Sequence, residues 1–219
     1  MYWPFRNKSD SAIIRICVKE PDMSELPQPI YDWAYSVYGE GSELFPHVLP
    51  EPLGNAVTLT HYVDANLYHN ILNGTSVTGI LHFINQTPID WYSKKQPTVE
   101  TATYGSEFVA ARTCAEQILD LRYTLRYMGV PNRGLSYMFG DNESVIGSSM
   151  HPHAKLHKRH VMLSFHHVRQ TIAHKIISFF YINGKNNPAD MVSKHWSHND
   201  IWPSLQPLLF WHGDTADLF

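Results

Sequence analysis

Alternating apolar and polar residues begin at residue 57 and predict a β-strand over residues 57–64 (VTLTHYVD). An Asn-Gly pair then marks a turn, and residues 77–84 form a second run rich in β-formers. A further turn at residues 85–88 leads to a third strand over residues 89–93. Three consecutive strands with short connections predict an antiparallel meander.

A helical period replaces this alternation after residue 100 and predicts a long helix over residues 101–128. Gly129 and Pro131 follow, and this pair of residues is typical of a helix end. The apolar residues of the helix recur at spacings of three and four and define one stripe. The stripe consists of Ala110, Cys114, Ile118, Leu121, Leu125 and Met128.

The rest of the domain alternates strands with helices. The predicted elements are a strand at residues 135–139, a short helix at 144–149, an amphipathic helix at 156–174, a strand at 175–182 and a last helix opened by Asn187 and Pro188. This order predicts an α/β fold in which helices flank a five-stranded mixed sheet whose first three strands are antiparallel.

The segments before and after these predicted strands and helices lack their regular pattern of apolar and polar residues. Repeated prolines interrupt residues 1–54, so we expect an irregular leader there, with one short helix at residues 31–38. The compact domain is expected over residues 55–195, followed by an aromatic C-terminal tail over residues 196–219. No apolar run is long enough to span a membrane, and the N-terminus lacks the hydrophobic region of a signal peptide. Two cysteines are too few for a disulfide scaffold, so an intracellular protein is expected.

The formal net charge of −3 taken alone argues against a nucleic-acid partner, but the charges are segregated. Residues 144–189 contain no Asp or Glu, against six Lys and Arg, and they hold seven of the fourteen histidines. Such a local basic surface is what a phosphate backbone requires. A solvated basic helix face with no ligand remains the alternative at this point.

Four carboxylates occupy corresponding places on the predicted elements. Asp64 ends the first strand, Glu107 lies on the apolar stripe of the long helix, Asp141 follows the fourth strand and Asp190 opens the last helix. Like charges brought to one edge of a sheet cannot all ionise without cations between them. Mg²⁺ prefers oxygen ligands, and two such ions can activate a water and stabilise the leaving oxygen of a phosphodiester.

Long strings of this sequence resemble the ribonuclease H region of copia-type LTR-retrotransposon polyproteins. The strings that carry the resemblance are YVDAN (62–66), the segment 76–131 with TYGSEFVAARTCAEQ, YMFGDNESV (137–145), KLHKRH (155–160) and NPADMVSKHW (187–196). The resemblance covers about residues 52–212 and implies an RNase H-like fold that cleaves the RNA strand of RNA–DNA hybrids. The leader is similar to the connection between polymerase and RNase H.

The resemblance also implies the site and its surroundings. Asp64, Glu107, Asp141 and Asp190 match the four acids that bind two Mg²⁺ ions in the family, with Mn²⁺ as a substitute. The residues expected to contact the hybrid are Asn142, Lys155, Lys158, Arg159 and Arg169. The implied partners are the hybrid and a reverse-transcriptase domain outside this chain, and the implied location is cytoplasmic virus-like particles or the nucleus.

The sequence departs from the family pattern in one loop and leaves two alternatives open. Many RNase H enzymes carry a histidine just before the last helix, whereas residues 183–187 here read NGKNN. Four histidines of the basic segment suggest a zinc site as one alternative, namely His151, His153, His157 and His160. The other alternative is a degenerate or domesticated module that binds nucleic acid without cutting it. The missing polymerase motifs suggest a fragment of a longer polyprotein or a truncated copy.

Overall fold

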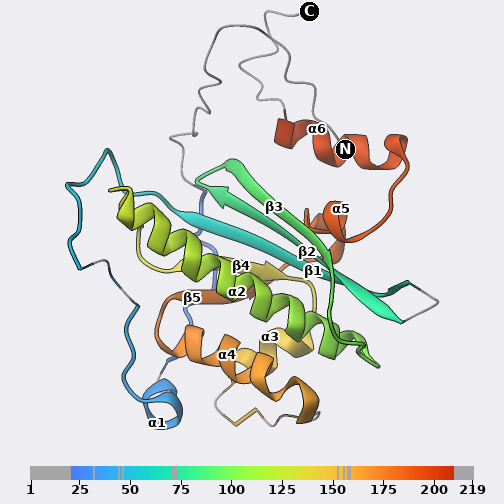
Figure 1. Ribbon diagram of the computed structural model, residues 1–219, viewed down its shortest axis with the longest axis horizontal. Helices are drawn as coiled ribbons and strands as arrows, with labels where there is room; N and C mark the ends of the chain where they lie inside the picture. Colours follow the sequence, from blue (N-terminus) through green and yellow to red (C-terminus); the bar gives the residue numbers. More distant parts are fainter. Residues whose placement is uncertain are drawn as a thin grey trace, which may run out of the picture.

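A five-stranded mixed sheet forms the centre of the protein (Figure 1). The computed structural model describes residues 21–209, except for residues 32, 44, 46, 71–73, 152, 155, 157 and 158. The strands are β1 (Leu59–Asn70), β2 (Thr75–Ile84), β3 (Thr87–Lys95), β4 (Ser136–Gly140) and β5 (Ile177–Tyr181), in the order β3-β2-β1-β4-β5. The first three strands are antiparallel, and β4 and β5 run parallel to β1. This topology confirms the expected α/β fold class.

Helices cover the sheet in two layers. Helices α2 (Thr103–Tyr127) and α4 (Met162–Ala173) pack against each other, and Figure 1 shows α2 crossing one face of the sheet. Helix α3 (Glu143–Met150) follows β4, while the one-turn helix α5 (Asp190–Ser193) packs on the other face, beside β2. Within the described residues, no helix is both long and apolar enough to cross a membrane.

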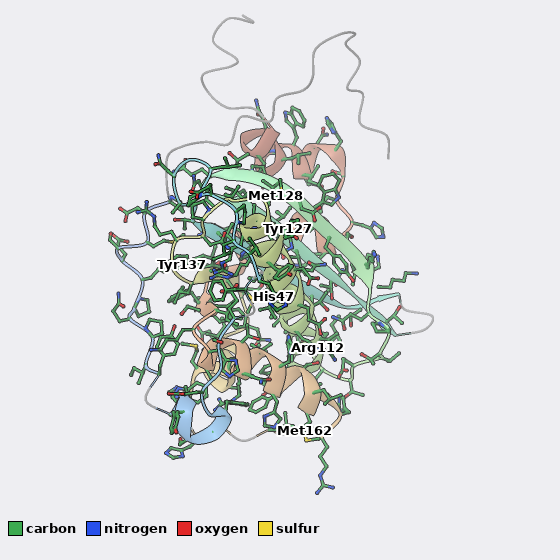
Figure 2. All side chains as sticks on the ribbon, turned by 60° about the vertical axis from the view of Figure 1, so that its left-hand side comes forward. His47, Arg112, Tyr127, Met128, Tyr137 and Met162 are labelled. Atoms are coloured by element: carbon green, nitrogen blue, oxygen red, sulfur yellow. The ribbon has the colours of Figure 1, made fainter. Side chains whose placement is uncertain are left out.

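The apolar stripe of the long helix is buried over most of its length. Ala110, Cys114 and Ile118 are fully buried in the main core cluster, which also contains Val63 of β1. Met128, the last residue of the predicted stripe, is instead 59% exposed, because it is the C-cap beyond the last helical turn (Figure 2). The prediction of the stripe is therefore confirmed in its centre and wrong at its C-terminal end.

Two predicted helices are shorter than expected. The basic helix expected from residue 156 begins only at Met162, after a 3₁₀ turn over Arg159–Val161. The last helix begins at Asp190 rather than at Pro188, because the side chain of Asn187 makes a turn with the N–H of Ala189 and ties that turn to β1. Helix α6 (His198–Leu209) lies within the segment expected to be an aromatic tail.

Part of the expected irregular leader is packed onto the domain. It contains α1 (Ala34–Tyr38), which contacts α4, and the Trp33 side chain is buried in the main core cluster. The Trp33 ring lies 4.3 Å from the guanidinium of Arg169. Further along, Glu43 pairs with the buried Arg122 of α2 at 2.6 Å. The leader residues that the structure describes thus contribute both apolar and charged contacts to the fold.

Candidate active site

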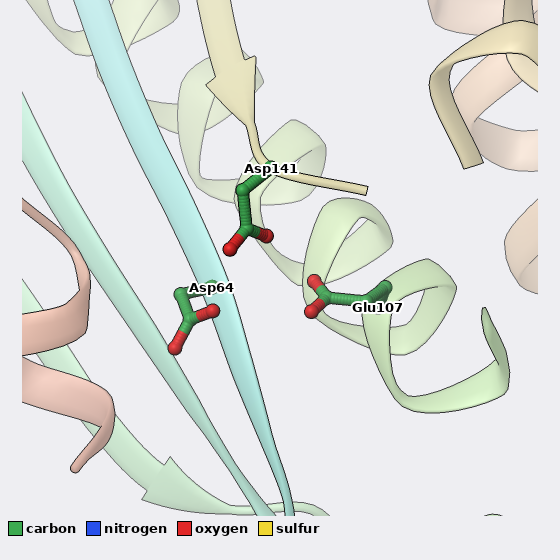
Figure 3. A group of neighbouring side chains, drawn as sticks. All are labelled: Asp64, Glu107 and Asp141. Atoms are coloured by element: carbon green, nitrogen blue, oxygen red, sulfur yellow. The ribbon is translucent and has the colours of Figure 1, made fainter. Parts of the chain in front are cut away.

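Three of the carboxylates predicted as ligands meet just beyond the point where β1 and β4 stop pairing; the prediction that the first strand ends at Asp64 is wrong, because β1 continues to Asn70. Asp64 lies on β1, Glu107 in the N-terminal part of α2, and Asp141 directly after β4. Each offers one oxygen atom, and these three oxygens all lie within 4.8 Å of one another. Figure 3 shows the three side chains converging from their separate elements. We call Asp64, Glu107 and Asp141 the carboxylate triad.

The strand pairing explains why the triad forms at this place. β1 pairs with β4 only over Thr60–Tyr62, so Asp64 lies two residues beyond the last pair of this ladder. The chain leaves β4 at Gly140, and Asp141 is therefore next to the part of β1 that has lost this neighbour. The gap between the two strands admits Glu107, which is hydrogen-bonded to the backbone of Ala65.

The triad opens into a cavity of about 440 Å³. The cavity lining is largely polar and comes from β1, α2, α3, β5 and the end of α5. It consists of Asp64, Ala65, Thr103, Glu107, Asp141, Asn142, Glu143, Ser144, Tyr181 and Lys194. A charged group of a ligand can therefore reach the carboxylates from solvent.

Burial raises the pKa values of the three triad carboxyls and so favours their neutral forms. The Asp64 side chain is almost fully buried, and desolvation raises its pKa to about 6 against the opposing effects of Ser193 and Lys194. Desolvation also raises the pKa of Glu107 well above its usual range, and the charges of Asp64 and Asp141 add to this effect. Desolvation and the charge of Asp190 raise the pKa of Asp141. Burial first and the neighbouring acids second therefore favour the neutral carboxyls, and a bound cation would favour their charged forms.

The donor set of the triad fits a hard divalent cation. All three ligands are carboxylate oxygens, and neither Cys nor His belongs to the cluster. Oxygen-only ligation favours Mg²⁺, Mn²⁺ or Ca²⁺ over zinc. A bound cation would be held by Asp64, Glu107 and Asp141, and it would lower the pKa of all three.

The fourth predicted ligand, Asp190, lies beside the triad but outside it. Its Oδ1 accepts a hydrogen bond from Lys194 Nζ at 2.6 Å, and the same ammonium lies 3.8 Å from Oδ2 of Asp64. The structure thus brings three of the four acids together and separates the fourth by a cation. Sequence reasoning missed Lys194, although its spacing of four residues from Asp190 is that of an ion pair on one helical turn.

Close packing of α5 on the sheet places this pair. Gly79 of β2 is opposite Asp64 in the strand register. A Cβ atom at Gly79 would lie 2.7 Å from the carbonyl oxygen of Ala189 and 2.8 Å from Cβ of Ser193. The absence of a side chain therefore lets α5 approach, and the Ser193 hydroxyl donates a hydrogen bond to Asp64. Asn187 donates to the carbonyl of Val63 at 2.9 Å and holds the preceding turn.

The residues expected to contact nucleic acid are placed in different surroundings. Asn142 lines the cavity, and its Oδ1 caps α3 by accepting from the N–H of Val145. Arg159 is exposed, whereas Lys155 and Lys158 lie outside the described residues. Arg169 is only 2% exposed and donates to the carbonyls of Ser148 and His151, among other buried contacts. The expectation that Arg169 binds a phosphate is therefore wrong, because the guanidinium is used inside the fold.

The histidines of the basic segment give no support to a zinc site. His160 is hydrogen-bonded through Nε2 to the buried Glu100 at 2.7 Å, and His157 lies outside the described residues. Across the residues that the structure describes, the only group with metal-ligand spacing is the carboxylate triad.

The loop before the last helix, which lacks the histidine of many RNase H enzymes, approaches the site at Gly184. A Cβ atom at Gly184 would lie 2.9 Å from Oδ2 of Asp141.

Comparison with solved structures gives weak but consistent similarities. An N-terminal RNase H domain from Mycobacterium tuberculosis, solved as a fusion with maltose binding protein, is similar with a TM-score of 0.49 and 10% identity, over 69% of this chain and 98% of that one. An RNase H1 isolated from compost also gives a TM-score of 0.49, with 15% identity, over 62% of this chain and 91% of that one. No family model matches the chain.

Comparison with curated sequences points to transposon polyproteins. The chain is 27% identical over 141 residues to the retrovirus-related Pol polyprotein from transposon TNT 1-94 of Nicotiana tabacum, and 21% identical over 141 residues to that from transposon RE2 of Arabidopsis thaliana. The match covers 64% of this chain but only 10% of either polyprotein. In sequence the chain is therefore similar to a short segment of retrovirus-related Pol polyproteins from plant transposons.

Proposed function

We propose that this chain is a Mg²⁺-dependent ribonuclease H that cleaves the RNA strand of RNA–DNA hybrids during retrotransposon reverse transcription. The observation that carries the proposal is the carboxylate triad, with Asp64 and Glu107 buried and Asp141 partly buried, which opens into a polar cavity beside β1 and the end of β4. The similarity to Pol polyproteins supports the same function. It also suggests a reverse-transcriptase domain as partner, and action inside the cell in virus-like particles or in the nucleus.

The chain's own groups divide the work of phosphodiester hydrolysis. Asp64, Glu107 and Asp141 would hold a divalent cation, and Asp190 would be the candidate fourth ligand for a second ion. Bound Mg²⁺ supplies the charge that activates a water and neutralises the departing 3′ oxygen. Burial of the triad keeps its oxygens oriented before substrate binds. The products would be a 5′-phosphate and a 3′-hydroxyl.

Substrate recognition is proposed to combine shape and charge. RNA is distinguished from DNA by contacts to 2′-hydroxyls across the wide minor groove, and the proposal assigns one such contact to Asn142, which lines the cavity. Arg159, together with Lys155 and Lys158, would bind backbone phosphates. In a plot of the logarithm of the binding constant against the logarithm of the salt concentration, the slope would then become more negative by about one unit for each phosphate contact.

A hybrid-cleavage assay with a matched pair of variants tests the proposal. The purified chain is expected to cut a labelled RNA strand paired with DNA in Mg²⁺, and not in EDTA. Asp141→Asn removes one triad charge and is expected to lower the rate at least about 100-fold, the usual cost of losing one preorganised charge contact. Glu143→Gln makes the same chemical change on an exposed acid of the cavity rim and should leave the rate nearly unchanged. Undiminished cleavage by Asp141→Asn would refute the assignment.

One observation favours the alternative of a binding module without turnover. Asp190 is paired with Lys194 instead of joining the triad, so the fourth acid is not presented as a free ligand. Such a module would retain hybrid binding and give no Mg²⁺-dependent product. The same assay, combined with a measurement of hybrid binding, separates the two functions.

A further inference from the structure

Lys194 places a positive charge between two of the acids that the proposed function assigns to metal. Its Nζ lies 2.6 Å from Oδ1 of Asp190 and 3.8 Å from Oδ2 of Asp64. Among the residues that the structure describes, no other Lys or Arg lines the cavity. The ammonium therefore sits on the Asp190 side of the site, and the triad oxygens converge on the other side.

The position of Lys194 is built into the end of α5. The helix makes a single turn, and the backbone of Lys194 leaves it in an extended conformation while its N–H still bonds to the carbonyl of Asp190 at 3.2 Å. The same carbonyl accepts from the indole of Trp196 at 2.9 Å, which fixes the chain on the far side. With Ser193 bonded to Asp64, the chain is anchored both before the lysine, at Ser193, and after it, at Trp196. Lys194 is thus held over the site by the backbone.

The charges around Lys194 keep it protonated. Partial burial alone would lower its pKa, but the hydrogen bond to Asp190 and the charges of Asp64, Asp190 and Asp141 raise the pKa above its usual value. Its ammonium, 2.6 Å from Asp190 and 3.8 Å from Asp64, is therefore a counter-ion that the chain itself supplies to the site. A divalent cation that uses Asp190 as a ligand has to displace this ammonium and then experiences its repulsion.

We propose that Lys194 is a positioning residue that holds Asp190 away from the triad and makes the site bind its two divalent cations with unequal affinity. The first cation binds to Asp64, Glu107 and Asp141, and the second binds only when Lys194 releases Asp190. This inference rests on the proposed function, because it concerns the same site. It adds that the occupancy of the second position is set by a lysine.

Mn²⁺ binding to the full chain, followed by the EPR signal of the free ion, tests the inference without any cleavage. The wild-type chain is expected to show one tight and one weak site. Lys194→Met should raise the affinity of the weak site about tenfold or more, as expected when a unit charge a few ångströms from a divalent ion is removed. Lys194→Arg keeps the charge and should retain the weak site. Lys95→Met removes an exposed lysine of β3 and is the control for net charge.

Thermal unfolding keeps the test decisive if Lys194→Met folds poorly. Without cation, that variant leaves four acids with no counter-ion, so its Tm should fall below that of Lys95→Met. Addition of Mg²⁺ should then raise its Tm by more than it raises the Tm of the control. Equal second-site affinities in Lys194→Met and the wild type, or two equal tight sites in the wild type, would overturn the inference. Wild-type chain that binds Mn²⁺ as expected but cuts no hybrid would overturn the proposed function and leave this inference standing.

Discussion

Gly79 is the point at which the sheet and the helix bearing Lys194 come closest, and its replacement by alanine tests the architecture of the site. The added Cβ would lie 2.8 Å from both N and Cβ of Ser193 and 2.7 Å from the carbonyl oxygen of Ala189. Carbon atoms in contact are normally about 3.5–4.0 Å apart, so α5 has to move by roughly 0.7 Å or more. No charged group is altered by this substitution.

The expected cost follows from two opposing effects. Overpacking of this kind destabilises by about 1–3 kcal/mol, whereas replacing glycine inside a strand recovers about 0.5–1 kcal/mol. The net loss of up to about 2.5 kcal/mol corresponds to a fall in Tm of up to roughly 10 °C for a chain of this size. The effect on hybrid cleavage should be larger, because a displacement on the order of 1 Å at a catalytic site can cost about 100-fold in rate.

Thermal unfolding and hybrid cleavage of Gly79→Ala are compared with those of Gly147→Ala. Gly147 lies within α3, and a Cβ there meets its nearest neighbour, Cδ2 of His151, only at 3.9 Å. This control should gain up to about 1 kcal/mol from helix propensity and keep its cleavage rate. A Gly79→Ala variant with wild-type Tm and wild-type cleavage would refute the close packing of α5 on β2.

Two further predictions concern buried groups away from the triad. His61 and His82 share a hydrogen bond of 2.7 Å inside the core, and burial lowers the pKa of both, so the unfolded chain binds more protons below about pH 6.5. Replacing both with leucine should reduce the loss of stability on acidification below that pH by up to about 1.4 kcal/mol per pH unit for each histidine, as measured by urea unfolding; an unchanged pH dependence would contradict this. Glu43→Gln leaves the buried Arg122 without its carboxylate and should cost about 3–5 kcal/mol in thermal unfolding, against about 0.3–0.5 kcal/mol for Glu116→Gln in an exposed pair.

The order of strands and long helices was predictable because it depends on patterns local to each segment. Alternation over residues 57–64 and the stripe through Ala110, Cys114 and Ile118 each indicate a buried face without knowledge of the partner. The convergence of Asp64, Glu107 and Asp141 was predictable for a related reason, since all three occupy ends or faces of those elements. The triad is thus a direct consequence of the strand order.

The other side of the site depends on contacts that local patterns do not contain. The start of α5 at Asp190 results from Asn187 bonding to the backbone of β1, and Lys194 lies directly after the single turn that follows. The same holds for Arg169, whose basic character suggested a phosphate contact. In the structure its guanidinium satisfies carbonyls at the end of α3 and lies against the ring of Trp33. The charge of an arginine does not by itself show whether its side chain lies on the surface or is buried in the fold.

The contact between Trp33 and Arg169 changes where the folding unit begins. A boundary drawn by composition near residue 55 would remove Trp33 from the core cluster and Glu43 from Arg122. The buried guanidinium of Arg169 would then lose its contact with the Trp33 ring, and that of Arg122 would lose the carboxylate of Glu43. A fragment intended to fold on its own therefore has to include the chain from before Tyr31, because the described part of the proline-rich segment supplies contacts to the core of the fold.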